Sequence, residues 1–259
     1  WESLIKLLKE IDEVLKEINN FEFSCIVIND FSIVKMPNIK KPSNIKFLNI
    51  INMKKNKGHG RCNAFGIRYI NENYNPDYVI LMDGDGEDRP IEIKSMITKI
   101  IATPKISVVA KRIKRSEGFI FQAMYRIHKL ITLMFTGKNI NFGNYSCLTY
   151  EDLKILANKA SLWSSYSGTV KKNIKDYNEI DSIRGTRYFG PSKMSLFNLV
   201  IHSFSIIAVF KYSVFFRSTL LIIILSLFYN HLEINSFFLQ VLLLIFNLII
   251  FIISFRENE

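Results

Sequence analysis

The feature that most constrains the fold is an uncharged run near the C-terminus, FFLQVLLLIFNLIIFIISF, which occupies residues 237–255. Its 19 residues come close to the roughly 20 that an α-helix needs to cross a bilayer. Core helices are usually shorter than this. The run therefore predicts a membrane-spanning helix, with a buried core hairpin as the alternative.

A second apolar segment, residues 214–232, precedes this run and contains Arg217. It can span a bilayer only if the arginine side chain reaches the headgroups. Lys193 and Lys211 precede the pair of segments, Arg256 follows it, and the linker NHLEINS has no Lys or Arg. By the positive-inside rule, the sequence predicts a multi-pass hairpin of two transmembrane helices, with the N-terminal domain and both termini in the cytoplasm.

The chain is long enough for a folded domain in addition to this hairpin, because it has 259 residues of which 49% are hydrophobic. We expect three parts. Residues 1–194 form the domain, residues 195–212 a juxtamembrane helix at the bilayer interface, and residues 213–255 the two membrane helices.

The formal net charge of +11 predicts an anionic partner, for which nucleic acid, phosphorylated small molecules and anionic lipid all qualify. The lysine-rich stretch 35–57 lacks the interleaved aromatic side chains of a nucleic-acid platform, so no nucleic acid is expected. The three cysteines have no CxxC spacing, which predicts neither disulfides nor a zinc site.

The N-terminal domain alternates between helical and strand-like patterns. Residues 1–18 have apolar side chains every three or four positions, which is typical of an amphipathic helix. Short apolar runs then begin at Phe23, Ile45, Tyr78 and Ile106. Because these runs are continuous rather than alternating, we expect strands covered on both faces in a mostly parallel α/β sheet, whose ligands bind at the carboxyl ends of its strands.

One strand runs directly into the acidic turn MDGDGEDRP, residues 82–90. The carboxylates of Asp83, Asp85 and Glu87 could converge there on one hard cation, since the glycines between them let the backbone turn. A solvated acidic turn is the alternative. In a basic chain, a cation held by carboxylates would make a site for a diphosphate.

Four segments in order carry a family resemblance: CIVINDFS, NKGHGRCNAFGI, MDGDGEDRP and RYFGPSKMS. The chain resembles the family 2 glycosyltransferases of GT-A fold over nearly its whole length. Within that family it resembles the membrane-bound branch of dolichol-phosphate mannosyltransferase and bacterial polyprenyl-phosphate glycosyltransferases. The resemblance implies a Rossmann-like α/β catalytic domain, a nucleotide-sugar donor and a divalent cation, Mg²⁺ or Mn²⁺, that bridges the donor's diphosphate.

The resemblance also implies roles for particular residues, each with a simpler alternative. Asp30 would contact the nucleoside, or it is an ordinary turn carboxylate. A loop after the second strand would shape the site of the base and ribose, and it can at the same time be the N-terminus of a helix. Arginines after the fourth strand grip phosphate or form a solvated basic face, and the last segment binds a lipid phosphate or is a positive-inside signal. The residues are Asp83, Asp85 and Glu87 for the metal, Asn56, Gly58 and Gly60 for the loop, Arg112 and Arg115 for phosphate, and Arg187, Ser192 and Lys193 for the lipid phosphate.

The sequence departs from the family pattern at three places. Asn29 and Phe31 replace an acid and a glycine of the nucleotide motif, which leaves the base preference open. Asn144 stands where the family often has an acid taken as the base, so the catalytic candidates are Asp85, Asn144 and Asp88, which could serve instead. The family's first strand and its P-x-x-N-E turn do not precede the first helix, so we expect the sequence to be a fragment.

The expected activity is that of an inverting, metal-dependent hexosyltransferase of cell envelope glycan synthesis. It would move a sugar from a UDP- or GDP-linked donor to polyprenyl phosphate at the cytoplasmic face. A phosphate acceptor is already ionised near pH 7 and needs positioning more than deprotonation, which agrees with Asn144. The alternatives are a saccharide or lipid hydroxyl acceptor, or a catalytically silent membrane-anchored relative. Homo-oligomerisation is left open.

Overall fold

The structure is a computed structural model that describes residues 1–114, 119–190, 195–229 and 234–258. It divides into two compact units, each made of segments that are not contiguous in the sequence. Unit 1 contains Trp1–Ser116, Asn141–Lys159 and Ile174–Lys193, and unit 2 contains Glu117–Ile140, Ala160–Asn173 and Met194–Glu259. The expected division placed all of residues 1–194 in one domain, whereas two internal segments of that range belong to unit 2.

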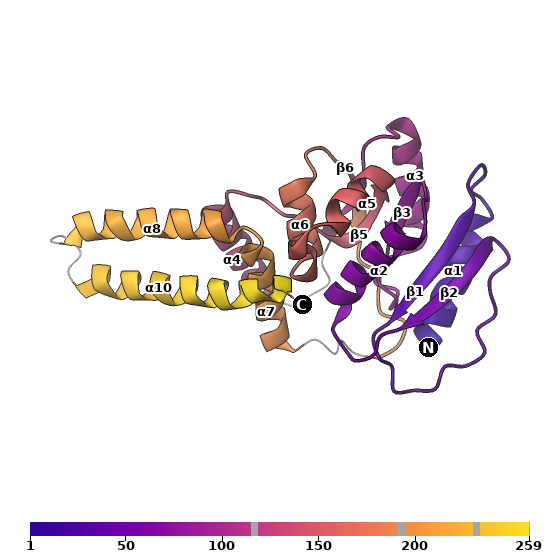
Figure 1. Cartoon of the computed structure of the whole chain (residues 1–259), viewed down its shortest axis with the longest axis horizontal. Coiled ribbons are helices and arrows are strands. Elements are labelled where there is room, and N and C mark those ends of the chain that lie inside the picture. Colours follow the sequence, from indigo (N-terminus) through magenta and orange to yellow (C-terminus); the bar gives the residue numbers. More distant parts are fainter. Residues whose placement is uncertain (115–118, 191–194, 230–233, 259) are drawn as a thin grey trace. The chain divides into compact units, whose positions relative to one another are not determined.

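Unit 1 is an α/β structure with helices beside two small sheets (Figure 1). Its elements are α1 (Glu2–Leu15), β1 (Phe23–Asn29), β2 (Ile45–Asn52), α2 (His59–Asn73), β3 (Tyr78–Leu81), α3 (Glu92–Ala102), β4 (Val108–Lys114), β5 (Phe142–Thr149), α5 (Tyr150–Ala157) and β6 (Asn178–Ile183). The first helix and the first four strands lie where the apolar pattern predicts them.

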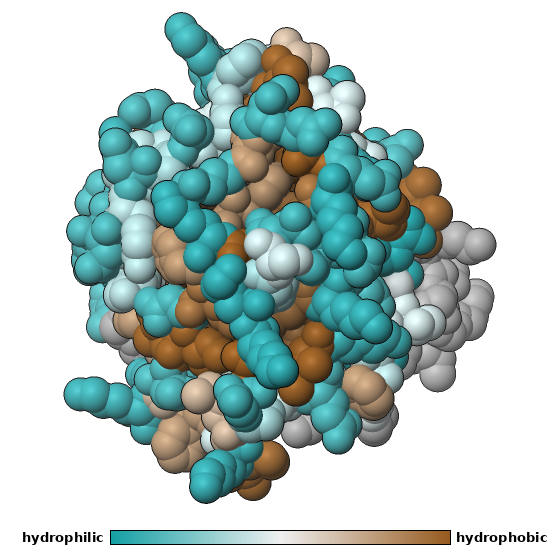
Figure 2. All heavy atoms as spheres, turned by 90° about the vertical axis from the view of Figure 1, so that its right-hand side faces the viewer, coloured by the Kyte–Doolittle hydropathy of each residue, from teal (hydrophilic) through white to brown (hydrophobic). Residues whose placement is uncertain are grey.

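Helix α1 buries its apolar face and leaves its charged face in solvent. Leu8 and Leu15 pack against Ile45 of β2, while Val14 packs against Ile93 and Ile97 of α3. The face of the molecule seen in Figure 2 is mostly hydrophilic, and its apolar patches are broken by polar side chains. The burial of α1 is therefore the one expected of an amphipathic helix at the surface of a folded domain.

The sheets are mixed, which corrects the expectation of a mostly parallel sheet. Strands β1 and β2 form a parallel pair. In the second sheet, of order β3-β5-β4-β6, β5 is antiparallel to both of its neighbours and only β4 and β6 are parallel. Continuous apolar runs reveal that both faces of a strand are covered, but they carry no information on its direction.

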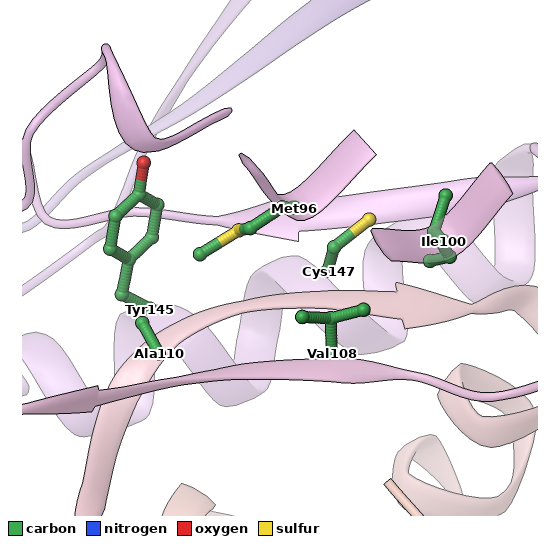
Figure 3. Packing of buried hydrophobic residues seen from close by; sticks show 6 residues of the cluster. All are labelled: Met96, Ile100, Val108, Ala110, Tyr145 and Cys147. Atoms are coloured by element: carbon green, nitrogen blue, oxygen red, sulfur yellow. The ribbon is translucent and has the colours of Figure 1, made fainter. Parts of the chain in front are cut away.

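The main core of unit 1 lies between α3 and the second sheet. Met96 and Ile100 of α3 face Val108 and Ala110 of β4, with Tyr145 and Cys147 of β5 in the same cluster (Figure 3). The Tyr145 hydroxyl leaves this apolar cluster and donates a hydrogen bond to the carbonyl oxygen of Arg89, at 2.8 Å. This bond ties β5 to the loop that carries the acidic residues.

Unit 2 is helical in its described residues. Its elements are α4 (Phe119–Thr136), the 3₁₀-helix η1 (Ala160–Trp163), α6 (Tyr166–Asn173), α7 (Leu196–Ala208), α8 (Lys211–Leu227), α10 (Ile234–Ser254) and the 3₁₀-helix η2 (Phe255–Asn258). Helices α8 and α10 pack side by side in opposite directions (Figure 1). Ser218 donates a hydrogen bond to Asn247 Oδ1 at 2.8 Å, and Ser236 donates to the carbonyl oxygen of Leu225 at 2.7 Å.

The expectation of two spanning helices is met only in part. Within the described residues, the segment Ile234–Asn258 is the one helix long and apolar enough to cross a membrane. Helices α7 and α8 pass the same test only as a pair, and they are bent by 89° where they meet. The reason is length, because α8 has 17 residues and ends at Leu227, short of the expected 214–232.

Arg217 does not lie free on α8 as a snorkelling side chain would. Its guanidinium donates a hydrogen bond to the carbonyl oxygen of Met134 at 3.0 Å, at the C-terminal end of α4. A cation at this end of a helix also interacts favourably with the helix dipole. The positive charge of Arg217, which disfavours α8 as a membrane segment, therefore has a hydrogen-bond acceptor within unit 2.

Candidate active site

Asp30 follows β1 and holds the loop that leads into α2. Its carboxylate accepts hydrogen bonds from the backbone N–H groups of Lys57 at 2.7 Å and Gly58 at 2.8 Å. Asn56 donates from its side-chain amide to the Asp30 carbonyl oxygen at 3.2 Å. Gly58 has φ 84°, a left-handed conformation that favours glycine, and Gly60 lies in the first turn of the helix. Asn56 and Gly58 are thus hydrogen-bonded to Asp30, and Gly60 follows them in α2.

Asn29 and Phe31, which depart from the family pattern, have defined places beside Asp30. The Asn29 amide donates to Asn52 Oδ1 at 2.8 Å and so links the ends of the two strands of the first sheet. Phe31 has φ 56°, in the region that glycine adopts most easily, and its ring is 51% exposed. The backbone therefore keeps a glycine-like turn here although the side chain is aromatic.

Asp88 is the buried member of the acidic turn after β3. Its Oδ2 accepts a hydrogen bond from the backbone N–H of Asp83 at 2.9 Å, and its side chain is close to fully buried. Its Oδ1 lies 3.9 Å from Arg112 Nη2, the end of a side chain on β4. The Asp83 carboxylate makes no ion pair or hydrogen bond with the described part of the chain.

Residues Gly143 and Asn144 of β5 complete this side of the site. The antiparallel register pairs Tyr78 with Thr149 and Leu81 with Ser146, so Asn144 lies two residues beyond the last pair, at the end of β3 that leads into the acidic turn. A Cβ on Gly143 would lie 3.1 Å from Arg112 Nη2, so the glycine leaves room for the guanidinium. The ends of three neighbouring strands therefore bring an amide, two carboxylates and an arginine together.

Burial raises the pKa of Asp88 to about 7, and the charge of Asp83 adds to this increase. The hydrogen bond from Asp83 N–H and the charge of Arg112 act in the opposite direction. A carboxyl group with a pKa near neutrality can accept and release a proton at physiological pH. Asp88 is therefore the residue in this loop best suited to proton transfer.

Asp85 and Glu87 face a different partner, the segment after β6. Arg187 contacts both acids, at 3.0 Å from Nη2 to Asp85 Oδ2 and 3.1 Å from Nε to Glu87 Oε1. Arg184 pairs with the second oxygen of Glu87. Burial alone would raise the pKa of Glu87, but the hydrogen bond and charge of Arg184, followed by Arg187, lower it below its usual value.

Tyr188 fixes this arginine segment over the acidic turn. Its backbone N–H donates to the Asp85 carbonyl oxygen at 3.0 Å, and its ring lies so close to Gly86 that a Cβ there would come within 2.6 Å of it. Its hydroxyl donates to Glu10 of α1 at 2.5 Å. The segment is thus attached both to the turn and to the first helix.

The predicted set of three metal ligands does not form. Across residues 1–114, 119–190, 195–229 and 234–258, no three His, Cys, Asp or Glu side chains are grouped so that they could hold a metal ion. Both carboxylate oxygens of Glu87 instead face guanidinium groups. Asp83 and Asp85 remain as candidate ligands, although Arg187 already occupies one oxygen of Asp85.

The other predicted residues fall into two groups. Arg187 lies on the acidic turn, where its guanidinium pairs with carboxylates. Arg115, Ser192 and Lys193 lie outside the described residues. Arg184, Tyr188 and Glu10 were not predicted, because nothing in the sequence near them indicates contacts with residues about 100 or more positions away.

Comparison with known proteins identifies a family. The sequence model of Glycosyl transferase family 2 matches residues 6–163, more than half of the chain, and this range runs from within α1 to beyond α5 and contains Asp30, the acidic turn and Asn144 but not the segment 184–188. A comparison with curated proteins found no match. The family implies a GT-A α/β fold and a transferase that uses a nucleotide-sugar donor and an acceptor. The chain belongs to glycosyl transferase family 2.

Proposed function

We propose that this glycosyltransferase moves a hexose from a UDP- or GDP-linked donor to a polyprenyl phosphate at the cytoplasmic face of a membrane, as an inverting enzyme. The observation that carries the proposal is the cluster of Asp83, Asp88, Arg112 and Asn144 at the ends of β3, β4 and β5. A guanidinium beside Gly143 and Asp88 suits an acceptor that brings its own negative charge.

The acceptor is a phosphate in this proposal because Asn144 cannot take a proton at neutral pH. A phosphate monoester oxygen is already ionised, so the site has to orient it rather than activate it. Arg112 is the described arginine that fits this role, since one of its nitrogens lies near Gly143 and Asp88. Arg115, Ser192 and Lys193 stay predictions for the same phosphate.

A hydroxyl acceptor is the second candidate, and one observation favours it. A hydroxyl needs a general base, and Asp88 has the raised pKa, about 7, that such a base requires. Asp88 accepts a hydrogen bond from Asp83 in the turn after β3, so it could replace the acid that many family members have at the position of Asn144. The two candidate acceptors differ because a hydroxyl must lose a proton to a general base, whereas an ionised phosphate need not.

The donor is assigned to the loops after β1 and β3. Asp30 holds the loop of Asn56, Gly58 and Gly60 in place, which supports a pocket for the nucleoside at the end of β1. Members of the family commonly use a divalent metal. Mg²⁺ or Mn²⁺ would be held by Asp83 and Asp85 and would supply positive charge to the leaving diphosphate. Arg187 then competes with the ion for Asp85.

Attachment to a membrane is assigned to α10 and its partner α8. Apolar side chains along both helices are exposed, among them Phe216 and Leu227 on α8 and Phe238 and Leu248 on α10. Large apolar side chains exposed on this scale are costly in water and favourable in lipid. The exposed face of α8 supports placing it in the same environment as α10, as the second arm of a hairpin.

The test is a transfer assay on membranes that carry the complete protein, with Mg²⁺ or Mn²⁺ and labelled nucleotide sugars. Polyprenyl phosphate should give an acid-labile labelled lipid, whereas the matched polyprenol should give none. No product with any donor would refute the transferase proposal. Product with polyprenol alone, lost in Asp88→Asn, would replace the phosphate acceptor by a hydroxyl.

A further inference from the structure

Helix α4 has its apolar face turned outward. Ile127 is 57% exposed and Leu130 is 65% exposed, and Leu133 and Met134 are about half exposed. At 100° per residue these four side chains lie within one face of the helix. A face of this kind would normally be the buried one.

The opposite side of the same helix buries polar side chains. Thr132 and Thr136 are only 3% and 4% exposed. Each hydroxyl donates a hydrogen bond one turn back along the helix, to the carbonyl oxygens of His128 and Thr132 respectively. The threonines therefore satisfy their hydroxyls locally, which is how polar side chains are accommodated in an apolar environment.

Two of the carbonyl groups at the C-terminal end of α4 have hydrogen-bond donors within the protein. The carbonyl oxygen of Leu133 accepts from Gly137 N–H at 2.8 Å, and that of Met134 accepts from Arg217 at 3.0 Å. Gly137 has φ 70°, and a Cβ there would lie 2.5 Å from Arg217 Nη2. Carbonyl groups without a partner are tolerated in water but are unfavourable in hydrocarbon, so the bonds of Leu133 and Met134 favour a place for this end near lipid.

The charge of α4 selects the type of surface. Its sequence, FIFQAMYRIHKLITLMFT, contains Arg126, His128 and Lys129 and no acidic residue. Arg126 is exposed within the same arc of the helix as Leu130 and Leu133, about one turn nearer the N-terminal end than Leu130. A basic helix with an apolar face is typical of segments that lie on anionic membrane surfaces.

The outward face continues the surface of the candidate membrane helix. The ring of Phe135 on α4 lies 4.7 Å from the ring of Phe246 on α10, measured between centroids. Ile131 and Phe135 share a hydrophobic cluster with Ile250 of α10. Because Phe246 lies within the span Ile234–Asn258, any bilayer around that span also reaches the end of α4.

We infer that α4 lies in the membrane interface, with Ile127, Leu130, Leu133 and Met134 among the acyl chains and its basic side chains at anionic headgroups. The occupant of this face is therefore a lipid bilayer. The inference rests on the membrane attachment in the proposed function but does not depend on sugar transfer. The sequence pattern alone places this helix in the N-terminal domain.

The test uses the full chain in nanodiscs of phosphatidylglycerol whose acyl chains are brominated, because bromine quenches tryptophan within the hydrocarbon. Leu130→Trp is compared with Ile5→Trp, a matched change at an exposed apolar position of α1, and with the parent protein, which has Trp1 and Trp163. The added emission of Leu130→Trp should fall by about half or more, as expected for a helix buried at the acyl boundary. That of Ile5→Trp should be unchanged.

Leu248→Trp on α10 tests the membrane anchor separately from the interfacial position of α4. If Leu248→Trp is quenched and Leu130→Trp is not, α4 faces water or protein and the inference is overturned while the membrane anchor stands. If neither is quenched, the anchor fails as well. Stronger quenching of Leu130→Trp in brominated phosphatidylglycerol than in brominated phosphatidylcholine supports the anionic preference, and equal quenching refutes it.

Discussion

Helices α1 and α4 are both amphipathic, yet they treat their apolar faces in opposite ways. In unit 1, α1 buries Leu8 and Leu15 against β2 and leaves its charged side chains in solvent. In unit 2, α4 exposes Leu130 and buries Thr132 together with Phe135. The same periodicity therefore fits two environments. The hydrophobic pattern tells which side chains share a face, but the neighbours of that face decide whether it meets protein or lipid.

The two units differ in their buried polar groups in the same sense. Unit 1 buries the carboxyl groups of Asp88 and Glu92, and each accepts hydrogen bonds from the backbone. In the described residues of unit 2, the buried polar side chains are serines and threonines. Hydroxyl groups can bond to their own helix, whereas a carboxyl group needs partners from elsewhere. The buried carboxyl group of Asp88 should therefore make the stability of unit 1 depend on pH.

The largest expected effect comes from shortening one leucine on each helix. Leu8→Ala should destabilise unit 1 by about 2 to 5 kcal/mol, because it leaves a cavity beside Leu15 and Ile45. Leu130→Ala should change stability by no more than about 0.5 kcal/mol in detergent, since the side chain is exposed. Urea unfolding followed by the emission of Trp1, which donates to the Val34 carbonyl oxygen, measures the first change. Equal effects at the two positions would contradict the contrast.

The next effect concerns Asp88. Its pKa is raised from 3.8 to about 7 in the folded chain, so the folded state binds the proton more tightly than the unfolded state between these values. Stability from this group is present at low pH and is lost as pH rises through 7, by about 1.4 kcal/mol between pH 6 and pH 8. Asp88→Asn should remove this slope from urea unfolding of unit 1, and an unchanged slope would assign it to another group.

Much of unit 1 could be predicted from local pattern. The positions of α1 and β1 to β4 follow from apolar runs and helical spacing, and the candidate residues Asp30, Asp83 and Asp88 follow from their place after strands. Strands β5 and β6 were missed. The first begins with Phe-Gly-Asn and the second reads NEIDSI, so neither contains the continuous apolar run that identifies a buried strand.

The parts of the site that escaped prediction depend on contacts between distant segments. Glu87 was assigned to a metal from its neighbours Asp83 and Asp85, but its partners are arginines near residue 185. The outward face of α4 is equally invisible in the sequence, because periodicity alone does not state which face is covered. Charge pairing and burial are properties of the fold, and the sequence near a residue constrains them only weakly.

Arg217 provides a smaller and more local test in unit 2. Arg217→Met should remove the hydrogen bond to the Met134 carbonyl oxygen and lower stability by about 1 kcal/mol, because a cation at a helix C-terminus contributes roughly this much. Thermal unfolding in detergent measures the loss. Arg126→Met removes the same charge from an exposed position of α4 that is far from the helix end, so it should have a smaller effect. A similar loss in both variants would show that net charge, and not the cap, is responsible.

Arg187 is the counterpart of Arg217 in unit 1, since its guanidinium meets carboxylates instead of a carbonyl group. Because Arg187 pairs with Asp85 Oδ2 at 3.0 Å, a divalent cation must displace it to use that oxygen. Arg187→Gln should therefore tighten Mn²⁺ binding by roughly two- to five-fold, the value of a partly exposed ion pair, while Lys46→Gln, which also removes one positive charge, should leave it unchanged. Mn²⁺ titration by electron paramagnetic resonance measures this without any substrate. Weaker binding in Arg187→Gln would mean that the arginine organises the carboxylates for the metal, and the contrast between a competing arginine in unit 1 and a capping arginine in unit 2 would disappear.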